Sequence, residues 1–193
     1  MPNMPAWGGA DACIGNNPLV IAVPREKGPV VLDMAMSQFS YGAIESFRMR
    51  GEPLPIDGGF DLDGNLTRDP AAIERSQRPL PIGFWKGSGL SVVLDMVAAM
   101  VSLGKATHQL TADPLLESGL SQVFIAINPA AFGPEPRAAK LADDVVASLH
   151  RSQPANEGTK IRYPGEKTLR VRAENLEHGL PIEPQVWEQI MAI

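Results

Sequence analysis

Short apolar runs rich in β-branched residues alternate along the chain with longer segments whose apolar positions recur at helical spacing. Two runs, 18–24 and 29–35, are bounded by Pro and Gly, a pattern typical of strands buried on both faces of a sheet. The polar turn between them ends on Gly28, so the runs are predicted to be neighbours in a hairpin. A third apolar run, 122–127, predicts a further strand.

Helical spacing of apolar residues predicts the other elements. The clearest case is 90–103, an apolar run closed by Gly104. As a helix it would span roughly 21 Å, less than the ~30 Å hydrocarbon core of a membrane, so a buried helix is expected. Its Met96 and Met100 are expected to pack in the core, and its Asp95 to be paired in a cleft. Further helices are expected at 37–50, 69–76, 136–151, 167–178 and 184–190.

Three segments lack any apolar period. Residues 1–17 contain turn residues without helical or strand spacing, and 105–119 is expected to be a loop. Residues 52–68 are rich in Pro, Gly, Asp and Asn, and a long ordered loop of this kind is usually functional. The order of predicted elements places the chain in the mixed α/β class.

Composition narrows the class of protein. The 193 residues are 44% hydrophobic and 20% charged, which is typical of a globular protein of one or two domains. The 17 Lys and Arg and 22 Asp and Glu give a net charge of −5 without a basic block, which disfavours a nucleic-acid partner. A single cysteine, Cys13, excludes an internal disulfide and favours a reducing cytoplasm. We expect Cys13 to be a small packed side chain.

The segment Gly83-Phe84-Trp85-Lys86-Gly87-Ser88-Gly89 leads into the apolar helix. Small residues, free N–H groups at a helix start and the charge of Lys86 favour a cradle for an anion. The glycines are spaced neither as in a phosphate-binding P-loop nor as in a dinucleotide fingerprint. The alternative is that they only let the chain turn into a tightly packed helix.

Other candidate sites carry less information. Residues 61–65 lack the Gly and the closing Glu of a calcium loop, so Asp63 and Asn65 are expected to bond the backbone of a turn. Asp61 could instead orient a catalytic group. The three histidines are far apart and lack ligand spacing, so no metal site is predicted.

A family resemblance rests on several strings taken together. They are Trp7-Gly8-Gly9 with 14–18, then 32–37, 61–67, 85–90 and 161–166. In this order they resemble the malate/L-lactate/ureidoglycolate dehydrogenase family from Pro5 to the C-terminus. The longer strings MSQFSYG, LPIDGGFDLDGNLT and LPIGFWKGSG are most similar to the branch that reduces 2,3-diketo-L-gulonate to 3-keto-L-gulonate.

The resemblance implies a homodimeric oxidoreductase that moves a hydride between a nicotinamide cofactor and a 2-keto or 2-hydroxy acid. The cofactor would be NAD in its reduced form, NADH, with NADP as an alternative. The implied fold is a mixed sheet with flanking helices that forms a non-Rossmann cofactor domain, which agrees with the missing fingerprint. By position, the cofactor-binding residues would be Pro29, Val30, Val31, Leu32, Asp33, Met34, Ala35, Trp85, Lys86, Gly165, Glu166 and Lys167.

Members of this family carry an N-terminal portion with a proton-donating His and an Arg that binds the substrate carboxylate, and neither is recognised here. The chain is therefore expected to be a C-terminal portion. Residues 1–150 would form an incomplete cofactor-binding domain, and 151–193 a helical segment that packs on the absent part. Asp61 would support the missing His.

Without the general acid, a loss of about 10²–10⁴-fold is expected, so the isolated chain would be a weak or inactive catalyst. The alternative is a non-catalytic remnant that binds the cofactor or a partner subunit without turnover.

Overall fold

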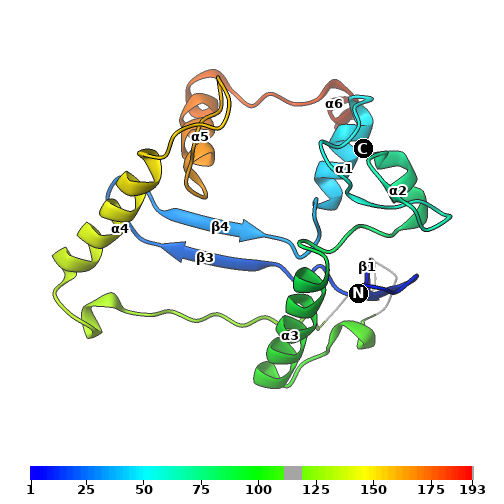
Figure 1. Cartoon of the computed structure of the whole chain (residues 1–193), viewed down its shortest axis with the longest axis horizontal. Helices are drawn as coiled ribbons and strands as arrows, with labels where there is room; N and C mark the ends of the chain where they lie inside the picture. Colours follow the sequence, from blue (N-terminus) through cyan, green and yellow to red (C-terminus); the bar gives the residue numbers. More distant parts are fainter. Residues whose placement is uncertain (111–118, 193) are drawn as a thin grey trace. The chain divides into compact units, whose positions relative to one another are not determined.

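The computed structural model describes residues 1–110 and 119–192 (Figure 1). The chain forms two compact units, the first made of 1–19 and 34–126 and the second of 20–33 and 127–193. The functional division into 1–150 and 151–193 stays a prediction.

The first unit begins with an antiparallel hairpin of β1 (Met4–Pro5) and β2 (Ala12–Ile14). The expectation that 1–17 lacks regular structure is therefore wrong. Met4 and Ile14 pack with the fully buried Met36. Short strands of this kind carry too few residues for a visible period-2 pattern, and the buried Met36 far along the chain stabilises them.

A second apolar cluster in the same unit joins α1 (Tyr41–Met49) to α2 (Pro70–Ser76). Its buried members are Ile44, Leu54 and Ile73. Both helices were expected, and the Asp69 side chain caps α2 by accepting from the Ala71 N–H at 2.9 Å. The segment expected to be a loop contains a small hairpin of β5 (Gly59–Phe60) and β6 (Leu66–Thr67).

Helix α3 (Trp85–Ser102) has one packed side and one exposed side. On the packed side, the buried Ser91 hydroxyl donates to the Gly15 carbonyl at 2.6 Å. The Asp95 carboxylate accepts from the backbone and side chain of Thr107 in η1 (Thr107–Gln109), so the expected pairing of Asp95 is confirmed. Met96 and Met100 are 57% and 74% exposed, so the expectations of a buried helix and of core packing for these two residues are wrong for the described chain.

The second unit contains the expected hairpin, in which β3 (Leu19–Val23) pairs with β4 (Val30–Met34). Figure 1 shows the two strands side by side with opposite directions. They were expected to be buried on both faces, but Val20 and Ile21 are 58% and 52% exposed. The reason is that each strand has one hydrogen-bonded neighbour in the described chain. A sheet of two strands offers little surface for covering its faces, so these side chains stay exposed.

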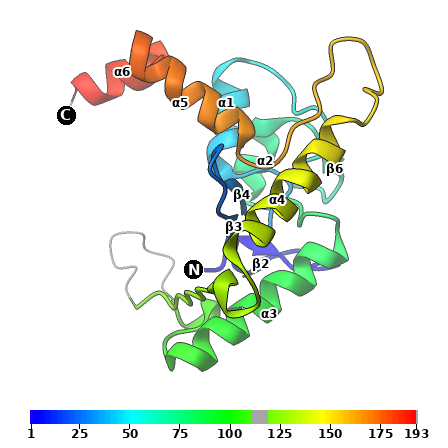
Figure 2. The ribbon, with the colours of Figure 1, turned by 90° about the vertical axis from the view of Figure 1, so that its left-hand side faces the viewer.

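Three helices complete the second unit, α4 (Glu135–His150), α5 (Glu166–His178) and α6 (Pro184–Met191). Figure 2 shows the long loop between α4 and α5. Residues 179–183 connect α5 to α6. All three were expected, and α5 ends at Gly179 as predicted. The only regular element between residue 119 and α4 is a single turn, η2 (Pro129–Ala131).

Residues 122–127 form no strand, which corrects the prediction made from their apolar run. Phe124 and Ile125 are 88% and 81% exposed, and in the described residues this segment has no strand partner. Strand propensity alone therefore did not decide its structure. The loop expected at 105–119 lies partly outside the described residues.

The described strands form three separate two-stranded sheets in place of one mixed sheet, while the mixed α/β class is confirmed. Cys13 is exposed, contrary to the expectation of a packed side chain. No helix in the described ranges is both long and apolar enough to cross a membrane.

Candidate functional site

A pocket of about 480 Å³ in the second unit lies between the start of β4 and the start of α5. Two segments that are more than 130 residues apart in sequence form its walls. The lining residues are Pro29, Val31, Leu32, Asp33, Pro164, Gly165, Thr168 and Leu169.

Gly165 allows the two walls to approach each other. The Val31 N–H donates to the Pro164 carbonyl at 2.9 Å. Gly165 has φ +89°, and a Cβ atom at this position would lie 3.2 Å from the Val31 nitrogen and 3.3 Å from its oxygen. Glycine is therefore required here both for the backbone conformation and for the close contact with β4.

The walls of this pocket are mainly apolar, with two polar side chains, the Asp33 carboxylate and the Thr168 hydroxyl. Ligand pockets are commonly about 300–1,000 Å³ in volume and have apolar walls with a few polar groups. None of the described residues in the lining carries a positive charge. This chemistry suits a flat ring with attached hydroxyl groups better than a phosphate.

The start of α3 in the first unit does not provide the expected row of free N–H groups. The amide of Lys86 donates to the Gly83 carbonyl at 3.2 Å, and that of Gly87 donates to the Ile82 carbonyl at 2.8 Å. A Cβ atom on Gly87 would overlap that same carbonyl. The tight turn into a packed helix, which was the alternative explanation of these glycines, therefore accounts for Gly87. The Lys86 side chain is exposed, as is that of Trp85.

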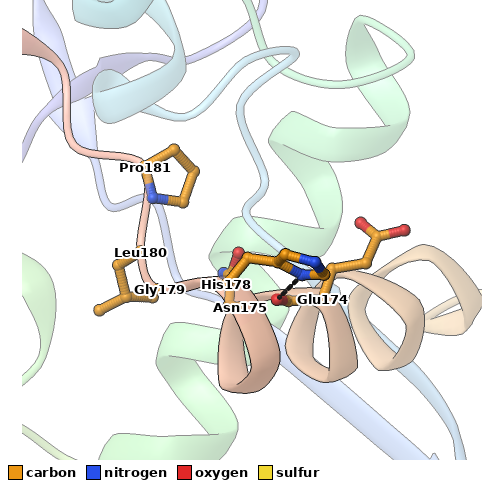
Figure 3. A pocket seen from close by; sticks show the side chains of 6 residues that line it. All are labelled: Glu174, Asn175, His178, Gly179, Leu180 and Pro181. Atoms are coloured by element: carbon orange, nitrogen blue, oxygen red, sulfur yellow. Dashed lines mark hydrogen bonds between the residues drawn. The ribbon is translucent and has the colours of Figure 1, made fainter.

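A second hollow, of about 490 Å³, lies at the end of α5 (Figure 3). It is lined by Glu174, Asn175, His178, Gly179, Leu180 and Pro181. The His178 Nδ1 atom lies 3.1 Å from the Glu174 carbonyl oxygen, a contact typical of the last turn of a helix. The described residues contain no group of three or more His, Cys, Asp or Glu side chains that could hold a metal ion.

Comparison with known proteins gives a match between residues 1–191 and the family model described as malate/L-lactate dehydrogenase. The chain belongs to this family. The expectation drawn from the sequence strings is thereby confirmed.

Curated and structural relatives agree with this assignment. A 2,3-diketo-L-gulonate reductase from Escherichia coli O127:H6 is 45% identical over 98% of the chain, which spans 57% of that relative's length. The solved sulfolactate dehydrogenase from Methanocaldococcus jannaschii has a TM-score of 0.82 and 31% identity, with 97% of this chain and 54% of that chain covered. A malate dehydrogenase from Entamoeba histolytica has a TM-score of 0.87 at 19% identity, over 99% and 57% of the two chains, and shows likeness of fold.

The structure brings together only some of the residues that the family resemblance assigned to the cofactor. Pro29, Val31, Leu32, Asp33 and Gly165 line the pocket. Outside its lining are Val30, Met34, Ala35, Glu166 and Lys167, as well as Trp85 and Lys86 in the first unit.

Two of these residues make other contacts. Met34 packs against the core cluster of Met4, Ile14 and Met36. The Glu166 carboxylate accepts from the Tyr163 N–H at 3.1 Å.

Three lining residues, Pro164, Thr168 and Leu169, were missing from the sequence-based site. Pro164 stands inside the string 161–166 that carried the family resemblance. Thr168 and Leu169 are three and four positions after Gly165, and this spacing places them on one face of a helix. The spacing was therefore a usable signal for these two residues.

Asp61 is held by hydrogen bonds within its own turn, which belongs to the segment 61–67 that contributed to the family resemblance. Its Oδ1 accepts from the Asn65 backbone N–H at 2.8 Å, and its Oδ2 accepts from the Asn65 side-chain amide at 3.3 Å. These hydrogen bonds lower the pKa of the Asp61 carboxyl. The turn-bonding role expected of Asp63 and Asn65 thus belongs to Asp61 and Asn65. A role of Asp61 toward a catalytic His stays a prediction.

Proposed function

We propose that the pocket between β4 and α5 binds the nucleoside part of a nicotinamide cofactor. The chain would thereby supply the cofactor-binding part of an NAD(P)H-dependent reductase of 2-keto acids. The observation that carries this proposal is the meeting of segments 29–33 and 164–169 around one ligand-sized pocket, since these segments overlap the family-assigned residues 29–35 and 165–167. Family membership also supports the proposal, since the family is one of dehydrogenases.

The proposed substrate is 2,3-diketo-L-gulonate, which would be reduced to 3-keto-L-gulonate. Identity of 45% over 98% of the chain to a reductase of that name supports this choice. The chain spans 57% of that relative's length, so the proposal concerns the whole enzyme, to which this chain contributes.

The pocket residues have distinct roles in this proposal. When bound, the cofactor supplies the hydride that is added to the keto carbon. Val31, Leu32 and Leu169 would contact the flat faces of a base ring, and burying this apolar surface favours binding. The Asp33 carboxylate and the Thr168 hydroxyl would bond the ribose hydroxyls. Trp85 and Lys86 stay proposed contacts for the remainder of the cofactor, and Asp61 a proposed support for a catalytic His.

A direct test fills the pocket with a bulky side chain. In Thr168→Phe the new ring would occupy space beside Gly165, whereas Arg172→Phe places the same ring on an exposed part of α5 outside the pocket. Titration calorimetry with NADH should show saturable binding by the wild type and by Arg172→Phe, and at least tenfold weaker binding by Thr168→Phe. Equal affinities for all three, or no saturable binding by the wild type, would refute the proposal.

A further inference from the structure

A cluster of charged and aromatic side chains lies beside the pocket without lining it. Its centre is Tyr163, immediately before the pocket residues Pro164 and Gly165. Arg25 from the β3–β4 turn approaches the Tyr163 ring, and His150 from α4 approaches it as well. The family resemblance assigned none of these three residues a role.

Arg25 is held by contacts with Asp143, with the Tyr163 ring and with the Gly28 carbonyl, to which its Nη1 donates at 3.5 Å. Its Nε donates to Asp143 Oδ1 at 2.8 Å, and its Nη2 lies 2.7 Å from the same oxygen. The guanidinium carbon is 5.2 Å from the centre of the Tyr163 ring, within the range of a cation–π contact. The hydrogen bond to Asp143 raises the pKa of the Arg25 guanidinium above its ordinary value.

Burial separates Arg25 from an ordinary surface charge. Its side chain is 5% exposed, whereas the side chain of Lys27 in the same turn is 77% exposed. The Lys27 Nζ atom is also farther from Asp143, at 4.0 Å from Oδ2. Arginines are seldom buried unless they are paired, and a planar guanidinium can bond a carboxylate and stack on a ring together. The Arg25 contacts are therefore a built arrangement, and Lys27 offers a matched control.

Helix α4 holds the same loop at a second point. The centres of the His150 and Tyr163 rings are 5.9 Å apart, and His150 Nε2 lies 3.2 Å from Glu166 Oε2. The same Glu166 oxygen accepts from the Tyr163 N–H. Asp143 and His150 are seven residues apart, about two helical turns, so both lie on one side of α4. Residues 163–166 are thus held to α4 by two sets of contacts. In one, Arg25 bonds Asp143 and lies over the Tyr163 ring, and in the other, His150 contacts Glu166.

The geometry points to a positioning role for these side chains, and we propose that Arg25, Asp143 and Tyr163 form a clamp that holds the Gly165 loop against β4 and so sets the width of the pocket. The loop is one pocket wall, and its only direct backbone bond to β4 among the described contacts is Val31 N–H to Pro164 carbonyl. A shift of this loop would change the distance between the two walls. The consequence for cofactor affinity rests on the proposed function, whereas the clamp itself does not.

Hydrogen exchange of the whole chain without cofactor tests the clamp first, in Arg25→Met with Lys27→Met as the control. We expect Arg25→Met to speed exchange about tenfold at the Val31 and Tyr163 amides, with no change in the interior of α5 or in α6. Lys27→Met should match the wild type. Asp143→Asn keeps the size of the partner side chain and should act in the same direction as Arg25→Met.

Titration with NADH then links the clamp to the pocket, with an expected loss in affinity of about five- to tenfold in Arg25→Met and none in Lys27→Met. Unchanged exchange, or faster exchange throughout α4, α5 and α6, would overturn the clamp, since the second result would indicate general destabilisation. Faster local exchange with unchanged NADH affinity would overturn the positioning role. If the wild type binds no NADH while exchange responds locally, the clamp is upheld and the proposed function is refuted.

Discussion

Replacing Gly165 with alanine perturbs the point where the two pocket walls meet. Its φ of +89° lies in a region that costs a residue with a Cβ about 1–2 kcal/mol. The new methyl would also press on the Val31 nitrogen and oxygen at 3.2 and 3.3 Å, contacts that the strand backbone relieves only by moving. Together we expect a loss of about 2–3 kcal/mol in the free energy of unfolding.

The matched control is Gly158→Ala in the loop before α5. Gly158 has φ +83°, close to that of Gly165, but a Cβ atom there would meet nothing within 4 Å. It therefore carries the backbone cost without the contact with β4. At roughly 2–4 °C per kcal/mol for a chain of this size, Gly165→Ala should lower the melting temperature by about 4–12 °C, and Gly158→Ala by about half as much.

Thermal melts followed by circular dichroism and NADH titrations of the two variants provide the assay. We expect only Gly165→Ala to weaken NADH binding, because only this substitution moves a pocket wall. If the two variants melt alike and bind NADH alike, the close approach of Gly165 to Val31 has no energetic role, and the argument from this glycine is wrong.

Three further predictions concern single charged residues. Because hydrogen bonds lower the pKa of Asp61 below 3.8, its stabilising contribution to the 61–65 turn should be present above pH 3.8 and lost as the pH falls through the lowered value. In NMR, the chemical shift of the Asn65 amide should therefore change as the pH falls through this range, and Asp61→Asn should abolish that change. Lys86→Ala should weaken NADH binding in quenching of tryptophan fluorescence if its charge contacts the cofactor, and unchanged affinity would exclude that contact. The Asp33 carboxylate should disfavour the extra phosphate of NADPH, so titrations should show tighter binding of NADH, and Asp33→Asn should narrow the difference.

The helices and the β3–β4 hairpin could be predicted because their signals are local. Asp69 before Pro70 marks the start of α2, and Gly179 marks the end of α5. The failures involve contacts with other parts of the chain. Residues 122–127 have strand propensity but no described strand partner, and the apolar composition of α3 does not specify what covers Met96 and Met100. Burial depends on which surfaces meet, and a local pattern does not contain that information.

The candidate site was predictable to a similar extent. Segments 29–33 and 164–169 could be assigned by family resemblance and helical spacing, but their meeting in space depends on the close approach of Gly165 to Val31. The amides of Lys86 and Gly87, which the anion cradle before α3 would need free, are paired with carbonyls of the preceding turn. The glycines can be seen in the sequence, but the carbonyl groups that pair with these amides cannot be predicted from it. The clamp around Tyr163 joins three segments and has no sequence motif of its own.

The most direct test of cofactor binding between β4 and α5 is an NADH footprint on the wild-type chain by hydrogen exchange and mass spectrometry. If the pocket binds the cofactor, saturating NADH slows exchange in peptides covering 29–33 and 164–169, the two walls of the pocket. Slower exchange only in other parts of the chain, or no change at a concentration that saturates binding, would contradict the assignment of this pocket to the cofactor.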